Sequence, residues 1–158
     1  MRERTLRSEA DWKDILTPEQ FSVTRRKGTE PAYTGKYCDF QGVGVYRCAC
    51  CGNALFSSEA KFETRWRSKW PTFREPVAQE NVRTLKEIQH FIIRHEVLCA
   101  CCDAHLGYAC EDGRPSIGLW YFINSCAITF VGNRGRAAHA SSFLLAPKSL
   151  QNSVVQAA

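Results

Sequence analysis

The spacing of apolar and polar residues predicts two short helices at the start of the chain. Ser8 precedes the amphipathic segment 9–15 and is a typical helix N-cap. A second helix begins with Thr17-Pro-Glu-Gln20, a capping-box sequence that has proline at the first helical position. We expect this helix to end at Gly28, because glycine readily adopts the left-handed conformation that closes a helix.

Beyond residue 44 the pattern changes to short β segments separated by turn residues. Many short strands of this kind predict a mainly β fold, built from antiparallel sheets or a barrel, with the short helices at its N-terminal end. The expected strands are 45–48, 54–57, 72–76, 82–86, 91–97, 106–110, 119–124 and 127–131.

Composition and charge fit one globular domain. Of 158 residues, 44% are hydrophobic and 23% are charged, as in an average globular protein. We expect a single domain at residues 1–131 and a partly mobile C-terminal extension at 132–158, in which Phe143-Leu-Leu145 is a candidate docking segment.

The same composition narrows the partners. The net charge of +5 comes without a recognition helix or an aromatic RNA platform, so we expect no nucleic-acid partner. No apolar run is long enough to cross a bilayer, and the charged start Met1–Arg7 lacks a signal-peptide core. We therefore expect a cytoplasmic monomer that takes a small-molecule ligand or substrate and has no membrane partner.

The cysteines are unusual for such a chain. Nine are present, an odd number without a secretory signal, which favours metal binding or thiol chemistry over a disulfide framework. Two CxxC pairs predict a structural zinc site, because four thiolates on tight turns suit tetrahedral Zn²⁺. The predicted ligands are Cys48, Cys51, Cys99 and Cys102.

Five cysteines remain outside this site. Cys50 and Cys101 lie inside the two knuckles and are interpreted as spectators. Cys38, Cys110 and Cys126 are either buried small side chains or candidates for thiol chemistry.

Several motifs, in order along residues 9–131, resemble methionine-R-sulfoxide reductase B. The resemblance implies a mostly antiparallel β fold with N-terminal helices and a four-cysteine zinc site. The motifs include Leu16-Thr-Pro-Glu-Gln-Phe21, Lys27-Gly-Thr-Glu-Pro31, Thr34-Gly-Lys-Tyr37, Trp70-Pro-Thr-Phe73, Glu96-Val, Asp103-Ala-His105-Leu-Gly107 and Ile123-Asn-Ser125.

The resemblance also implies an active site, and the chain departs from it. The family uses a thiolate or selenolate that attacks the sulfoxide sulfur, and Phe122 stands at that position. A phenyl ring cannot form a sulfenic acid, which closes the usual route there. Trp120 replaces an arginine, Tyr108 a histidine, and Ser68 the usual resolving cysteine. The implied positions that remain are Trp70, His105 and Asn124.

These replacements lead to our main functional hypothesis: a pocket repurposed for non-redox chemistry, such as isomerisation, cyclisation or elimination, on a small apolar or aromatic molecule. His105 and Tyr108 would transfer protons and Asn124 would hold an oxygen. The residues expected to bind the substrate are Trp70, Cys110, Trp120 and Phe122.

Two alternatives stay open. One is a peptide-methionine (R)-S-oxide reductase that uses a relocated cysteine, Cys110 or another thiol. The other is a non-catalytic module that binds a ligand in an aromatic cage.

Overall fold

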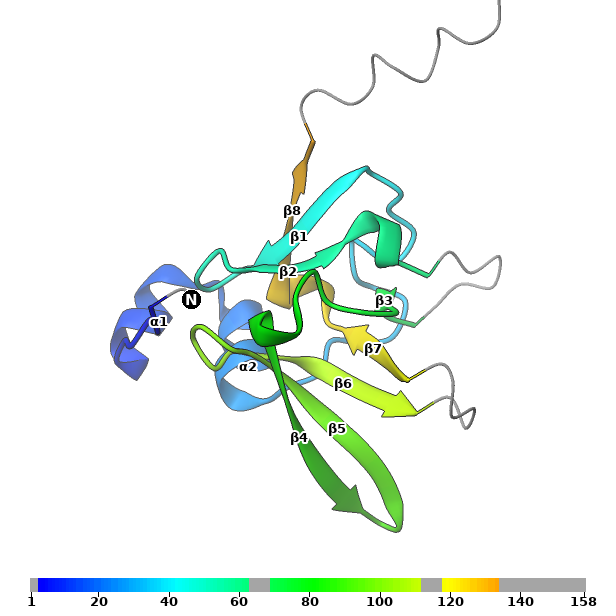
Figure 1. Cartoon of the computed structure of the whole chain (residues 1–158). Helices are drawn as coiled ribbons and strands as arrows, with labels where there is room; N and C mark the ends of the chain where they lie inside the picture. The colour runs from blue at the N-terminus through cyan, green and yellow to red at the C-terminus, as the bar shows by residue number, and fades with distance from the viewer. Residues whose placement is uncertain (1–2, 63–68, 112–117, 134–158) are drawn as a thin grey trace, which may run out of the picture.

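The computed structural model describes residues 3–62, 69–111 and 118–133. Two helices precede two antiparallel sheets (Figure 1). Residues 134–158, which hold most of the predicted extension and its apolar segment, lie outside the described residues, as does Ser68. The division of the chain at residue 131 stays a prediction.

Both predicted helices form with the predicted caps. Helix α1 spans Glu9–Ile15 and α2 spans Pro18–Arg26, each opened by a capping box. The prediction for the end of α2 was wrong by one residue. Lys27, with φ of 58°, takes the left-handed position, and the Gly28 N–H donates to the Ser22 carbonyl at 3.0 Å.

The eight predicted strands are all present in the described part of the chain. The sheet of three strands has the order β2-β1-β8, and the sheet of five has the order β3-β7-β6-β5-β4. The bounds are β1 Gly44–Cys48, β2 Ala54–Ser57, β3 Thr72–Phe73, β4 Val82–Gln89, β5 Ile92–Cys99, β6 His105–Glu111, β7 Leu119–Ile123 and β8 Ile128–Gly132. Strands β4 and β5 are longer than the sequence pattern predicts, and β3 is shorter.

An aromatic core joins the two sheets. Phe73 of β3 stacks on Phe56 of β2 with ring centroids 4.5 Å apart, and it meets Tyr46 of β1 edge-on at 5.1 Å. Tyr121 of β7 contacts Phe56 at 5.6 Å. Because these rings are almost fully buried, they account for much of the hydrophobic driving force that packs the sheets together.

The outer face of the five-stranded sheet is only partly covered. Along β7, Tyr121 and Ile123 point into the core, whereas Trp120 and Phe122 on the opposite face are half-buried. Side chains alternate across a strand, so Trp120 and Phe122 lie on the same face of β7. We call the face of the five-stranded sheet that carries these two residues the outer face.

Candidate functional site

The two CxxC pairs fold into matching knuckles. The Gly52 N–H donates to the Cys48 carbonyl, and the Asp103 N–H donates to the Cys99 carbonyl, both at 2.9 Å. The residue after each pair is left-handed, with φ of 73° at Gly52 and 57° at Asp103. Glycine and aspartate tolerate this conformation better than most residues, so each short sequence forms its own metal-binding turn.

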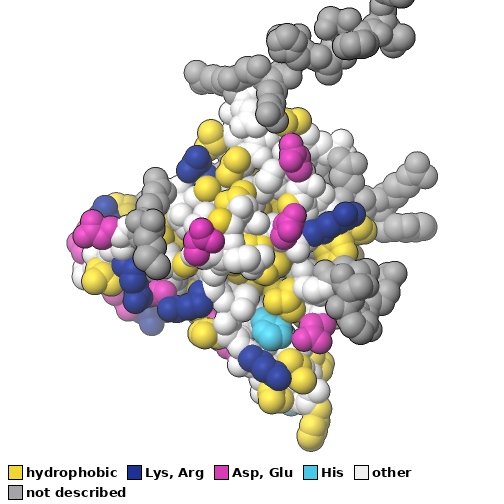
Figure 2. Space-filling model, viewed as in Figure 1, with side chains coloured by type: hydrophobic (Ala, Val, Ile, Leu, Met, Phe, Trp, Pro, Cys, Tyr) yellow, Lys and Arg dark blue, Asp and Glu magenta, His cyan; other side chains and the backbone are white. Residues whose placement is uncertain are grey.

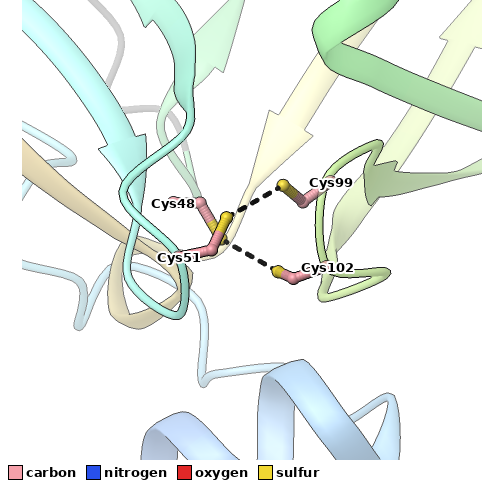
Figure 3. A group of neighbouring side chains, drawn as sticks. All are labelled: Cys48, Cys51, Cys99 and Cys102. Carbon is pink, nitrogen blue, oxygen red and sulfur yellow. Dashed lines mark hydrogen bonds between the residues drawn. The ribbon is translucent and has the colours of Figure 1, made fainter. Parts of the chain in front are cut away.

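The knuckles bring four sulfur atoms together between β1, β5 and the turns that follow them (Figure 3). The Sγ atoms of Cys48 and Cys102 are 3.7 Å apart, and those of Cys51 and Cys99 are 3.6 Å apart. Sulfurs placed tetrahedrally about 2.3 Å from Zn²⁺ lie about 3.8 Å from one another. The spacing fits the metal, and these four cysteines form the predicted zinc site.

The surroundings of the cluster suit a structural metal. Arg25 of α2 donates to the carbonyl of Cys102 at 2.9 Å and to its Sγ at 3.4 Å. Asn53 donates its side-chain N–H to Cys99 Sγ at 3.7 Å. Such contacts orient the ligands and offset their negative charge. Cys50 and Cys101 lie outside the four-sulfur group, as predicted.

The outer face of β6 and β7 collects the candidate pocket residues. Tyr108 lies directly opposite Phe122 in the ladder, and Cys110 lies directly opposite Trp120. All four side chains are half-buried. The predicted substrate-binding positions on these two strands therefore share one surface.

His105 reaches this region through an irregularity in the ladder. The register between β5 and β6 shifts after Val97, so Leu98 pairs with His105 where regular pairing would give Leu106. Nδ1 of His105 lies 2.8 Å from Oε1 of Glu96, and the imidazole meets the Tyr108 ring at 5.2 Å. A β-bulge commonly redirects a side chain in this way.

A chain of charged groups holds His105. Lys27, at the end of α2, pairs with Glu96 at 2.8 Å and also with Glu87 of β4. Burial lowers the pKa of His105, and the hydrogen bond that its ring donates to the Glu96 carboxylate opposes this effect. The imidazole is thus held neutral, and its buried Nε2 has no hydrogen-bond partner among the described residues. That nitrogen can accept or pass on a proton.

Arg94 of β5 supplies a positive charge to the outer face. Its guanidinium lies 4.0 Å from the centre of the Tyr108 ring, a cation–π contact. Burial raises the pKa of the Cys110 thiol, and the charge of Arg94 partly offsets that effect. Burial also raises the pKa of Tyr108, which keeps its hydroxyl a proton donor at neutral pH.

Asn124 serves the interior of the fold. Its Oδ1 accepts the Glu30 N–H at 2.9 Å, and its Nδ2 donates to the Leu106 carbonyl at 3.0 Å. The residue is 3% exposed. Both ends of its amide are therefore engaged in positioning the loop around Glu30, and its predicted role as an oxygen anchor stays untested.

Trp70 is placed by the same loop. Its Nε1 donates to the Glu30 carbonyl at 3.1 Å, and the indole is half-buried. The Glu30 carboxylate accepts the backbone N–H groups of Ser125 at 2.6 Å and Cys126 at 3.1 Å. Glu30 thus ties Trp70 to the turn that follows β7.

The aromatic residues have separate neighbours. Trp120 meets Phe62 edge-on at 4.9 Å, with Arg74 5.8 Å from its centre, whereas Tyr108 lies against His105 and Arg94.

The sequence interpretation missed the roles of Lys27, Arg94 and Glu96. Lys27 and Glu96 stand in motifs that carried the family resemblance, which was the available signal.

The comparisons with known proteins agree on one family. The SelR domain matches residues 16–132. A peptide methionine sulfoxide reductase MsrB of Synechococcus sp. (strain RCC307) is 46% identical over 78% of this chain and 89% of its own length. Proteins of the same name from Thioalkalivibrio sulfidiphilus and Hahella chejuensis are 45% and 40% identical, over 80% and 85% of this chain and 88% and 96% of their own lengths.

These findings correct our main functional hypothesis. The prediction of a pocket repurposed for non-redox proton transfer was wrong, because the relatives just named are sulfoxide reductases and align over most of the chain. They favour the reductase alternative over both the repurposed pocket and the aromatic cage. The family assignment itself was correct: the chain belongs to the SelR family of methionine-R-sulfoxide reductase B proteins.

Proposed function

We propose that this protein reduces peptide-bound methionine-R-sulfoxide, with the thiol of Cys110 acting in place of the one missing at Phe122. The family and the relatives indicate a methionine sulfoxide reductase. The observation that carries the finer proposal is the position of Cys110, on the outer face and directly opposite Trp120. Diagonal neighbours in an antiparallel ladder lie about 7–8 Å apart, so Cys110 is one such step from Phe122.

Cys110 is the best placed of the three remaining thiols. Cys126 follows the end of β7, and burial, together with the charge of Glu30, raises its pKa to about 12. Cys38 lies in the wall of a cavity of about 320 Å³ beside Lys61 and Phe62, and burial raises its pKa as well. Only Cys110 shares the face of Tyr108 and Phe122 and has a cation, Arg94, that favours its thiolate.

The proposed reaction needs one thiol in the protein and an external thiol reductant. The Cys110 thiolate attacks the sulfoxide sulfur, the S–O bond breaks, and the oxygen passes to Cys110 as a sulfenic acid while methionine leaves as the thioether. The Tyr108 hydroxyl donates a hydrogen bond to the sulfoxide oxygen and supplies the proton that the sulfenic acid carries, and the phenol regains a proton from solvent. A reductant thiol then condenses with the sulfenic acid to release water, and a second thiol frees Cys110.

The test is turnover of a peptide that contains methionine-R-sulfoxide, with dithiothreitol as reductant. We expect the R epimer to be reduced, the S epimer to be left, and Cys110→Ser to lose at least about 100-fold in kcat/KM. Dimedone added with substrate should label Cys110. Cys126→Ser and Cys38→Ser are matched controls that should keep their activity. Absence of turnover by the unmodified protein, or full activity in Cys110→Ser, refutes the proposal.

A further inference from the structure

The β4–β5 hairpin extends away from the body of the molecule (Figure 1). Its two strands pair without interruption from Val82 with Cys99 to Gln89 with Ile92. The outermost rungs join Gln89 to Ile92 and Ile88 to Ile93, and the turn of His90 and Phe91 closes them. We call residues 88–93 the hairpin tip.

The tip exposes apolar side chains in every direction. Phe91 is 102% exposed, Ile88 71%, Ile92 66% and Ile93 51%. Because side chains alternate along a strand, Ile88 and Ile93 lie on one face of the hairpin, Ile92 lies on the other, and Phe91 lies at the end. Figure 2 shows apolar side chains gathered there, beside a basic one.

Formation of the turn does not explain Phe91. Both His90, with φ of 50°, and Phe91, with φ of 66°, are in the left-handed region. Such two-residue turns favour Asn-Gly, and a bulky aromatic residue holds this conformation at a cost. The turn would form more readily without the ring that it presents to solvent.

The charges beside the tip are basic. Residues 88–95 contain Arg94 but no carboxylate. Lys86, two residues before the tip, is exposed. Glu87 is the nearest carboxylate, and it pairs with Lys27 and, at 3.6 Å, with Arg94. An apolar end with a basic margin complements the interface of an anionic bilayer, where hydrocarbon lies below phosphate groups.

We propose that the hairpin tip inserts into the surface of a membrane that contains anionic lipid. The apolar side chains lie on both faces of the hairpin and at its end, an arrangement that suits a medium surrounding the tip. Insertion at the interface needs no membrane-spanning segment. Within the described residues no helix is long and apolar enough for a span.

The test is flotation of the full chain with vesicles of phosphatidylcholine alone or with 30% phosphatidylserine added. We expect the protein to float with the anionic vesicles and to bind the neutral vesicles more weakly. Binding to the anionic vesicles should weaken at high salt, because salt screens the attraction between the basic side chains and the lipid phosphates. Phe91→Gly combined with Ile92→Thr should reduce the partition coefficient at least about tenfold. Glycine suits the turn at position 91, and threonine suits the strand at position 92. The variant is therefore expected to fold, and its thermal unfolding checks this.

Val131→Thr is the matched control, because Val131 is an exposed apolar residue of β8, in the other sheet. It should bind vesicles as the unmodified protein does. The proposal is overturned if the unmodified protein binds neither vesicle, or if the folded hairpin variant binds as well as the control. A dimer in light scattering that the hairpin variant abolishes, without vesicle binding, would assign the tip to a second copy of this chain instead.

Discussion

Cys110 of β6 lies directly opposite Trp120 of β7, on the half-buried outer face of the five-stranded sheet. The next rung along joins Tyr108 to Phe122. A thiol, a phenol and two aromatic rings are thus adjacent on two neighbouring strands. This adjacency supplies a thiol on the face where the family's nucleophile position holds Phe122.

Activity should rise with pH. The reactive species is the thiolate, and burial raises the pKa of Cys110 above its usual value, so the thiolate fraction is small at neutral pH and grows as the medium becomes alkaline. Arg94→Gln removes the charge that lowers this pKa and should move the profile of kcat/KM to higher pH. Arg83→Gln is the control, since Arg83 pairs with Asp103 at 2.9 Å. A profile unchanged by Arg94→Gln would contradict the role given to this cation.

Restoring the family residues should create a second route. The double variant Phe122→Cys, Trp120→Arg places a thiol and a fixed cation on the outer face beside Tyr108 and His105. We expect the reductase rate to rise at least about tenfold, and the new activity to persist when Cys110→Ser is added. Loss of activity in that triple variant, although it is folded, would mean that the surrounding face no longer binds the sulfoxide.

Removing one zinc ligand should destabilise the fold. Cys102→Ser leaves three sulfurs for a metal that needs four ligands, and we expect zinc content to fall from about one per chain and Tm to drop by about 10 °C or more. Metal analysis and thermal unfolding measure both. Cys101→Ser is the neighbouring control, because Cys101 lies outside the four-sulfur group. Equal zinc content and equal Tm in the two variants would count against a structural metal.

Glu30 should matter for stability more than any surface carboxylate. It is 4% exposed and accepts the N–H groups of Ser125 and Cys126. Glu30→Ala leaves the buried Ser125 N–H and the partly buried Cys126 N–H without this partner, which should cost about 2–5 kcal/mol of unfolding free energy. Glu30→Gln keeps one acceptor and should cost less. Glu19→Ala, at an exposed position of α2, should stay within about 0.5 kcal/mol, and urea unfolding compares them.

The sequence alone determined the elements whose signals are local. The caps at Ser8 and Thr17, the zinc knuckles and the short strands depend on residues a few positions apart, and the structure confirms them. The resemblance of the chain's motifs to the family implied the antiparallel β fold, which the structure shows. The prediction of a non-redox function was wrong because it gave more weight to the single position Phe122 than to the agreement of the rest of the chain with reductases.

Tertiary structure decided which side chains meet. Glu30 and Ser125 are 95 positions apart, and Lys27 is joined to Glu87 across 60. Lys27 ends α2 where its amine reaches Glu96, and a register shift turns His105 toward the same carboxylate. No local pattern specifies such contacts, because they depend on how a helix and a twisted sheet pack, and packing is settled by the core as a whole. The sequence could name the candidate groups, but only the folded chain placed Cys110 directly opposite Trp120 and on the same face as Phe122.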